Sequence, residues 1–269
     1  MVVDPRAPVV GMNYPWPWRG LSAITALTLI TAWACWQVDI HPGRLFSSTG
    51  MTAAWDQAAR LLTPSMRIDV WLRLGEATLS TLALATAGSI IAALISLALL
   101  PFASVSLMPS RILRHVACLL ANALRTIPYL VWALVLIMML GLGPKPAAIA
   151  LGLHTGGVLT RLFTGAVDSL NQAPLNALRH AGASRLGLLL FGVLPQVRAQ
   201  LLSIWLYRWE INLREATVLG MVAAGGLGHE LAMAFGQFKY QTVSAALCAL
   251  VLLVLAGESL SAWLRRRTV

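Results

Sequence analysis

Four charged side chains lie close together in an apolar stretch of this sequence, and they are the residues best suited to do chemistry. The stretch 206–215 reads Leu-Tyr-Arg-Trp-Glu-Ile-Asn-Leu-Arg-Glu. A charge at the centre of a lipid bilayer costs about 2.5–3.5 kcal/mol, whereas each Leu or Ile returns only about 0.3–0.6 kcal/mol. Apolar neighbours cannot offset four exposed charges, so these side chains must be paired, buried in a helix bundle or close to water.

Helical spacing sorts these residues onto two faces. At about 100° per residue, Arg208, Asn212 and Glu215 share one face. Glu210 and Arg214, at i and i+4, share the opposite face and can form an ion pair. A helix that is polar on both sides does not face lipid, which predicts a central helix. Two interpretations stay open: the side chains line a hydrophilic pathway, or they form a neutral polar network that holds the bundle together.

Arg125 is a further charge within an apolar segment. Pro128, three residues later, loosens a helix and frees backbone carbonyls. Arg125 therefore either faces the same pathway or extends to the inner membrane surface. His154 lies beside Thr155-Gly156-Gly157, and we expect it to be packed and hydrogen-bonded. The five histidines and three cysteines show no ligand spacing, so we expect no metal site and no cofactor.

Composition sets the class of protein. The 269 residues are 58% hydrophobic and 11% charged, whereas a soluble domain has about a quarter charged residues. The mean hydropathy of +0.75 agrees with an integral membrane protein. The net charge of +10 comes from basic residues in short loops and at the C-terminus, as the positive-inside bias predicts. No basic face carries stacking aromatics, which argues against nucleic-acid binding.

Uncharged runs of about 20 residues predict the elements that carry these side chains. We expect an all-α, polytopic membrane protein with six spans and both termini in the cytoplasm. The first run has a rival interpretation, a cleaved signal peptide ending near Ala32-Trp33-Ala34. The predicted segments are a cytoplasmic N-terminal stretch 1–19, a transmembrane domain 20–264 with spans near 20–38, 77–101, 116–142, 147–167, 197–222 and 240–263, and a cytoplasmic tail 265–269.

The connections between the spans also carry predictions. Within 39–73, the residues Trp55, Ala58, Ala59 and Leu62 fall at helical spacing and predict a short interfacial helix. Loops rich in glycine are expected outside, at 141–144 and 223–228. The glycines of the fourth span predict close helix packing.

One inner loop, 171–195, is basic and has a distinctive glycine. No acidic residue occurs between Asp168 and Glu210. Pro174 can begin a helix, and Gly182 permits a sharp turn or a close approach. We predict a short basic helix, a glycine elbow, and a second helix that leads into the fifth span at Leu194-Pro195.

This loop resembles the cytoplasmic loop of ABC importer permeases, whose pattern is Glu-Ala-Ala, three residues, Gly, nine residues, Ile, one residue, Leu-Pro. Ala177, Gly182, Leu194 and Pro195 match in register. The sequence departs from the pattern at three positions: Asn176 replaces Glu, Leu178 replaces the second Ala, and Gly192 replaces Ile. Further motifs resemble the phosphonate-type branch of these permeases: Leu124–Pro128, Leu130–Leu134, Gly141–Pro144, Leu153–Thr155, Tyr207–Glu210, Asn212, Arg214, Thr217–Gly220 and Gly225–Gly228.

The resemblance, which covers roughly 70–267, implies a type I ABC importer permease of a bacterial inner membrane. It implies a homodimer, two ATP-binding subunits that hydrolyse ATP, a periplasmic binding protein, and a substrate such as phosphonate, phosphite or hypophosphite. The loop would be the coupling helix that contacts the ATPase, and the chain itself would catalyse nothing. The predicted coupling residues are Asn176, Ala177, Leu178, Arg179, Gly182, Ala183, Arg185, Leu194 and Pro195.

Two other functions stay open. One is an ABC importer of another solute, such as an amino acid or an osmolyte. The other is an intramembrane enzyme acting on phosphate esters, which needs a nucleophile–base pair or a metal cluster at one depth. The predicted pathway residues for an anion are Arg208, Glu210, Asn212, Arg214, Glu215 and Arg125.

Overall fold

The computed structural model describes residues 18–37, 48–184 and 187–268, and every regular element within them is a helix. The chain divides into two units, residues 1–58 and 59–269. The helices are α1 (Trp18–Gln37), α3 (Ser48–Leu61), α4 (Ile68–Ala103), α5 (Arg111–Thr126), α6 (Tyr129–Leu140), α7 (Pro144–Asp168), α8 (Gln172–His180), η1 (Leu188–Val193), α10 (Leu194–Leu219), η2 (Gly220–Ala224), α11 (Gly226–Gly236) and α12 (Tyr240–Thr268).

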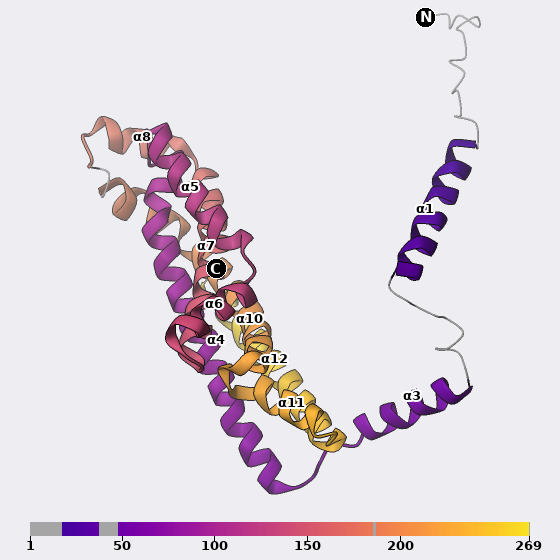
Figure 1. Ribbon diagram of the computed structural model, residues 1–269. Helices are drawn as coiled ribbons and strands as arrows, with labels where there is room; N and C mark the ends of the chain where they lie inside the picture. The colour runs from indigo at the N-terminus through magenta and orange to yellow at the C-terminus, as the bar shows by residue number, and fades with distance from the viewer. Residues whose placement is uncertain (1–17, 38–47, 185–186, 269) are drawn as a thin grey trace, which may run out of the picture. The chain divides into compact units, whose positions relative to one another are not determined.

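The first unit contains α1 and most of α3. The predicted short helix within 39–73 is confirmed: α3 contains Trp55, Ala58 and Ala59, and Leu62 follows its last residue. Its place at a membrane interface stays a prediction. The second unit holds the bundle from α4 to α12 (Figure 1). The stretches 1–17 and 38–47, with Arg185 of the inner loop, lie outside the described residues.

Helices α4 and α7 form the central pair of the bundle, and small residues let them approach closely. A Cβ atom on Gly152 would lie 2.5 Å from Cγ2 of Ile91, and one on Gly156 would lie 3.0 Å from Cβ of Ile95. These glycines therefore remove the bulk that would separate the two backbones. The close packing predicted for the glycine-rich segment is confirmed.

The predicted third span differs from the structure. The chain forms two helices, α5 and α6, that meet at an angle of 87°. Pro128 occupies the N-cap position of α6. A proline lacks the N–H that would continue the α5 hydrogen bonds, and it disfavours helical geometry in the residue before it. The proline therefore ends one helix and begins another, rather than loosening a continuous one.

The glycine loop expected at 223–228 is largely helical. The segment η2 continues α10 with wider turns, Gly225 (φ 83°) breaks the helix, and α11 follows at once. The N–H of Leu227 donates to Oγ1 of Thr81 at 2.9 Å. Helix α11 therefore packs back against α4. From the sequence only the break itself could be predicted.

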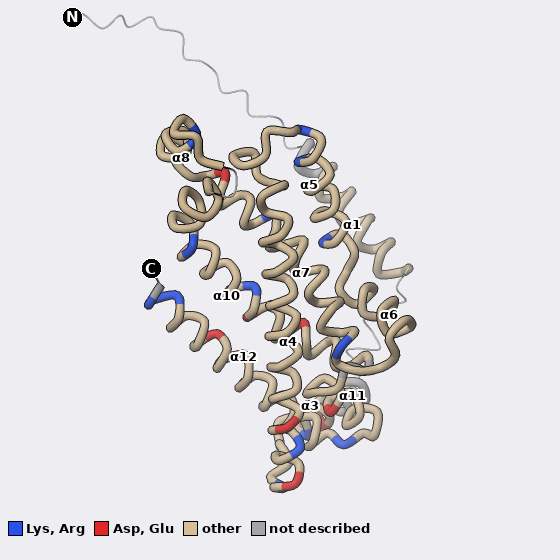
Figure 2. The backbone as a smooth tube through the Cα atoms, turned by 90° about the vertical axis from the view of Figure 1, so that its left-hand side faces the viewer, with Lys and Arg blue, Asp and Glu red and all other residues tan. Residues whose placement is uncertain are grey.

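Among the described residues, three helical segments are long and apolar enough to cross a membrane: Ile68–Ala103, Leu188–Val222 and Tyr240–Arg267. The bent pair of α5 and α6 gives a fourth if it counts as one span. The remaining predicted spans fall on α1 and α7, which are 20 and 25 residues long. Figure 2 shows mostly Lys and Arg, with an acidic segment beside α8, at the end of the bundle that holds α5 and α8, and both basic and acidic residues at the opposite end.

Candidate functional site

Helix α10 buries one of its two polar faces inside the bundle. Arg208 and Glu215 are 11% and 17% exposed, and Nη2 of Arg208 lies 3.7 Å from Oε1 of Glu215. The same Nη2 donates to Oγ1 of Thr155 on α7 at 3.3 Å. The predicted face of Arg208, Asn212 and Glu215 is therefore present, and it points toward α7.

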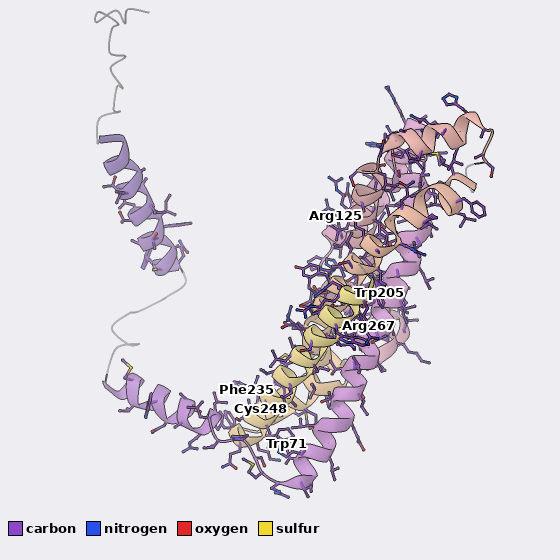
Figure 3. The ribbon with its side chains drawn as sticks, turned by 180° about the vertical axis from the view of Figure 1, so that it is seen from behind. Trp71, Arg125, Trp205, Phe235, Cys248 and Arg267 are labelled. Carbon is purple, nitrogen blue, oxygen red and sulfur yellow. The ribbon has the colours of Figure 1, made fainter. Side chains whose placement is uncertain are left out.

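Asn212 ties three helices together at this level. It is fully buried; its Nδ2 donates to Oγ of Ser89 on α4 at 2.7 Å, and its Oδ1 accepts from Oγ1 of Thr155 at 2.9 Å. Two tryptophans of α10 add bonds to α4: Nε1 of Trp205 reaches the carbonyl of Ser89, and Nε1 of Trp209 reaches Oγ1 of Thr86. Figure 3 shows Trp205 among the packed helices. Buried polar groups that are satisfied in this way fix the positions of the helices relative to one another.

The buried ion pair keeps unused hydrogen-bonding capacity. Nε of Arg208 and Oε2 of Glu215 are buried and have no hydrogen-bond partner among the described residues. A buried polar atom without a partner costs about 1–3 kcal/mol. Tyr129 and His154 form an edge-on ring contact close by, with centroids 5.9 Å apart, and Nδ1 of His154 lies 3.1 Å from the carbonyl of Ile127. The packed histidine expected from the sequence is confirmed. The Nε–H of Arg208 is a donor that no described residue uses.

The opposite face of α10 forms a second ionic group, shared with α12. Nη2 of Arg214 lies 3.4 Å from Oε1 of Glu210, so the predicted i,i+4 pair is present. The same guanidinium also pairs with Glu258, and Nη2 of Arg265 lies 3.8 Å from Oε2 of Glu210. Sequence reasoning missed Glu258 and Arg265 as partners. A carboxylate directly after Gly257 in an apolar span was the available signal.

Arg125 stands apart from both groups. Its side chain is exposed, and its Nε donates to Oδ1 of Asn122 one turn earlier on α5 at 3.0 Å. Figure 3 shows it in the half of the bundle that contains α8. Among the described residues no hydrogen bond or ion pair joins it to Arg208. Its predicted place in a pathway therefore has no contact to support it.

The inner loop has the predicted form of helix, elbow and second helix. Helix α8 begins at Gln172, because the Asn171 side chain caps the N–H of Ala173; Pro174 lies inside the first turn rather than at its start. Gly182 has φ 83°, and the N–H of Ala183 donates to the carbonyl of Leu178. This is the hydrogen bond of a Schellman helix end, whose left-handed residue is usually glycine. The glycine is required by the turn itself.

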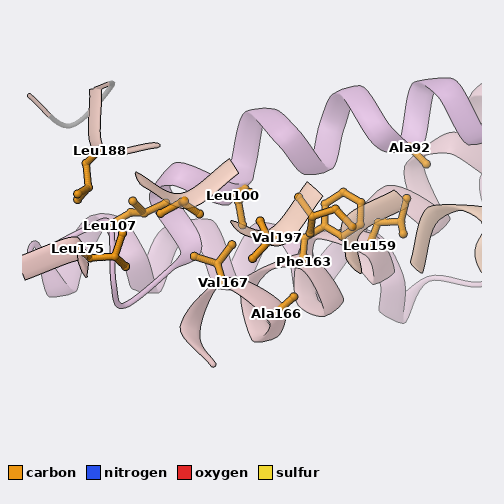
Figure 4. Packing of buried hydrophobic residues seen from close by; sticks show 12 residues of the cluster. Ala92, Leu100, Leu107, Leu159, Phe163, Ala166, Val167, Leu175, Leu188 and Val197 are labelled. Atoms are coloured by element: carbon orange, nitrogen blue, oxygen red, sulfur yellow. The ribbon is translucent and has the colours of Figure 1, made fainter. Parts of the chain in front are cut away.

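One leucine of helix α8 is fully buried in the bundle. Leu175 is fully buried in a cluster that includes Leu107, Val167, Leu188 and Val197 (Figure 4). Asn176, Ala177 and Ala183 are exposed. The loop therefore presents a polar and small-residue surface outward while its apolar side is held by α4, α7, η1 and α10.

A polar group fixes α8 to the connection between α4 and α5. Arg179 donates to the carbonyl of Ser106 and to Oδ1 of Asn176, and Nε2 of Gln172 donates to Oγ of Ser106 at 3.0 Å. The Asp168 carboxylate accepts from Oγ of Ser104 at 2.6 Å and from the N–H groups of residues 105 and 106 at 3.3 and 3.1 Å. Arg179 is therefore bonded within its own chain, to a partner that no sequence pattern indicates.

Two of the departures from the importer loop pattern meet in space. A Cβ atom on Gly192 would lie 3.0 Å from both Cδ1 of Leu178 and Cδ2 of Leu175. Leu178 stands where the pattern has a small residue, and Gly192 stands where it has a large one. The larger side chain of one position thus fills the space that the other leaves open.

Comparison with known proteins places this geometry in context. A family described as binding-protein-dependent transport system inner membrane component matches residues 88–269. The chain is 34% identical to the phosphite transport system permease protein PtxC of Stutzerimonas stutzeri, over 95% of this chain and 92% of that protein. It is 32% identical to the phosphate-import permease protein PhnE of Mycolicibacterium smegmatis, over 89% of this chain and 44% of that protein.

Solved structures show the same fold at low sequence identity. The inward-facing MetNI methionine ABC transporter matches with a TM-score of 0.66 and 19% identity, over 76% of this chain and 100% of that one. An amino acid ABC transporter structure matches with a TM-score of 0.60 and 15% identity, over 76% of this chain and 99% of that one. The helical arrangement described above is therefore that of a type I ABC importer permease.

Proposed function

The chain belongs to the family of binding-protein-dependent transport system inner membrane components, and from this premise we propose that it imports a phosphorus oxyanion such as phosphite or a phosphonate. Membership makes the chain a multi-pass inner-membrane permease. It also implies a binding protein, an ATPase and a second permease as partners. Relatives over most of the chain are named for phosphite transport, which supports the substrate class. The observation that carries the proposal is the buried Arg208 with its unpartnered Nε.

The Arg208–Glu215 pair suits a site that binds an anion only briefly. An oxyanion accepts from a guanidinium through two parallel bonds, and Nε and Nη2 of Arg208 supply such an edge. Glu215, at 3.7 Å from that Nη2, competes for the same cation. Transport requires binding strong enough to admit a solute and weak enough to release it. The carboxylate sets that limit, so selectivity is expected to reside mainly in the binding protein.

The second permease is expected to cover the charged face shared by α10 and α12. Arg214 and Glu258 are 46% and 40% exposed in the single chain, on helices apolar enough to span a membrane. A charge facing lipid is expensive. Beside Arg214 lies an apolar hollow of about 430 Å³ between α10, α11 and α12. A homodimer that packs these faces together removes the charges from lipid.

The loop at 171–195 is expected to receive the force from two ATPase subunits. Its exposed surface, with Asn176, Ala177 and Ala183, faces the cytoplasm in this proposal, as do both termini. ATP favours the global state that it binds best, so closure of the ATPase dimer would move α8. Leu194 and Pro195 join this loop to α10, which carries Arg208. Hydrolysis in the ATPase resets the transporter, and the chain itself catalyses nothing.

Reconstitution tests the proposal. Liposomes containing the permease, its ATPase and its binding protein are expected to take up radiolabelled phosphite or methylphosphonate when ATP is enclosed on the cytoplasmic side. Inorganic phosphate, hypophosphite and an amino acid serve as competitors. Uptake of the amino acid with no phosphorus oxyanion uptake would establish the rival importer function. Hydrolysis of phosphate esters by the purified chain alone would instead revive the enzyme alternative.

A further inference from the structure

A basic hollow lies at the end of the bundle opposite α8. It has a volume of about 790 Å³ and lies between the start of α4 and the turn that joins α11 to α12. Its charged lining residues are Arg60, Arg67, Asp69, Arg73 and Lys239. Figure 2 shows Lys and Arg side by side with acidic residues at this end. The buried network around Arg208 contributes no residue to this hollow.

The charges of the hollow do not balance. The carboxylate of Asp69 forms a bidentate ion pair with Arg67, with Nε–Oδ1 and Nη2–Oδ2 distances of 3.1 Å each. Among the described residues no carboxylate lies within 4.0 Å of Arg60, Arg73 or Lys239. An adjoining hollow of about 170 Å³ shares Arg73 and Lys239 and adds one carboxylate, Glu230. A surplus of positive charge therefore remains over both hollows.

The backbone that carries these cations is firmly held. The N–H of Ser65 donates to the carbonyl of Gln241 at 3.0 Å, and Nε1 of Trp71 donates to the carbonyl of Ser65 at 2.9 Å. Phe238 has a positive φ of 55°, unusual for a residue with a bulky side chain. Its turn is closed by a bond from the N–H of Lys239 to the carbonyl of Ala234. The start of α4 and the turn bearing Lys239 are thus joined into one framework.

We propose that this hollow is a second anion site, at which a phosphorus oxyanion is held weakly at the outer end of the permease. Guanidinium and ammonium groups pair with oxyanions, and a concave wall of one charge raises the local concentration of the opposite ion. The cations are solvent-exposed, so salt screens the site and exchange is fast. The choice of anion and the outer orientation rest on the proposed function.

Equilibrium binding of inorganic phosphate tests the site without transport. The permease–ATPase complex is placed in nanodiscs of zwitterionic lipid, with no nucleotide and no binding protein, and binding is followed by phosphorus NMR line broadening. The double variant Arg73→Gln/Lys239→Gln is expected to weaken binding about tenfold, and about 0.5 M sodium chloride to weaken it similarly. Lys145→Gln is the matched control, because Lys145 at the start of α7 is exposed and lies outside the hollow.

Each outcome decides the assignment. Phosphate binding that is unchanged in the double variant overturns it. Loss of wild-type phosphate binding when anionic lipid replaces zwitterionic lipid assigns the hollow to lipid headgroups and also overturns it. If the double variant binds phosphate normally but no longer binds the binding protein, the hollow is a docking surface for that protein, and the assignment as an anion site is overturned. Failed uptake by the wild-type complex would refute the proposed function, whereas the difference in phosphate binding between the variants would still stand.

Discussion

Exchanging the sizes of Leu178 and Gly192 tests whether the two departures from the importer loop pattern compensate each other. Gly192 is buried, and its added Cβ would lie 3.0 Å from two leucine methyl carbons, closer than the 3.5–4.0 Å at which carbon atoms pack best. Gly192→Ile adds four carbons there and is expected to destabilise the complex by about 1–3 kcal/mol through overpacking. Leu178→Ala removes half-buried apolar surface and is expected to cost about 1–2 kcal/mol.

The double variant Leu178→Ala/Gly192→Ile is expected to be destabilised by less than the sum of the destabilisations of its two single variants. It nearly conserves volume, and volume-conserving core exchanges usually cost less than about 1.5 kcal/mol. The coupling free energy between the two positions should therefore reach about 1–2 kcal/mol in the stabilising direction. For a chain of this size about 1 kcal/mol corresponds to a shift of about 2–4 °C in melting temperature. Thermal melting of the permease–ATPase complex, with binding-protein-stimulated ATP hydrolysis as a second readout, measures it.

A control exchange separates contact from general loosening. A Cβ on Gly165 of α7 meets no atom within 4 Å. The pair Leu178→Ala and Gly165→Ile should therefore be additive in melting temperature. If the Leu178/Gly192 double variant is also merely additive, the two positions do not compensate, and the reasoning from their contact is refuted.

Three further predictions concern the buried pair and the inner loop. Arg208→Ala leaves Glu215 buried without its partner and should destabilise the folded permease by about 3–5 kcal/mol. The double variant Arg208→Ala/Glu215→Ala should regain melting temperature without regaining uptake. Normal uptake by the double variant would show that the pair is not part of the pathway. Asp168→Asn removes a charged acceptor, worth about 1.5–3 kcal/mol per bond, and should lower binding-protein-stimulated ATP hydrolysis; unchanged stimulation would show that α8 needs no such anchor. Gly182→Trp should leave the protein inserted but uncoupled, since a left-handed residue with a bulky side chain is strained; stimulated hydrolysis at the wild-type rate would contradict a coupling role.

The sequence predicted the two faces of α10 because helical periodicity depends only on residue spacing. It predicted the pair of Glu210 and Arg214 for the same reason. Partners on other helices could not be predicted from the sequence, since Glu258 is 44 residues from Arg214 and no periodic pattern joins them. Thr155 and Ser89, which bind Asn212, lie 57 and 123 residues from it in the sequence and look like ordinary small polar residues of apolar spans.

Features of the fold that depend on nearby residues, such as the positions of helices, could be predicted from the sequence. Features that depend on contacts between helices could not. Length and hydropathy located α10 and α12 to within about five residues at each end, whereas α4 begins at Ile68, well before the span predicted from residue 77. Pro128 showed that the third span is interrupted, but the angle of 87° follows from how α6 packs. Gly225 likewise marked a break, whereas the helix α11 beyond it depends on Thr81 of α4 accepting that chain end through the N–H of Leu227.

Helix α4 gives the inner loop a second mechanical route to the buried pair. The direct route runs from Leu194 along α10. The second route begins at Ser106, in the connection that follows α4. Arg179 and Gln172 of α8 bind this residue, as does Asp168 at the end of α7. Farther along α4, Ser89 holds Asn212, one turn from Arg208. Helix α8 is bonded to the connection that follows α4, and it precedes α10 in the chain, with the Gly182 elbow and η1 between them. A push on α8 would therefore be expected to act on both α4 and α10. If α4 and α10 moved by the same amount, the Ser89–Asn212 bond would not change. Only a difference between their displacements would strain it, so sliding of α10 past α4 is the motion that would reposition Arg208.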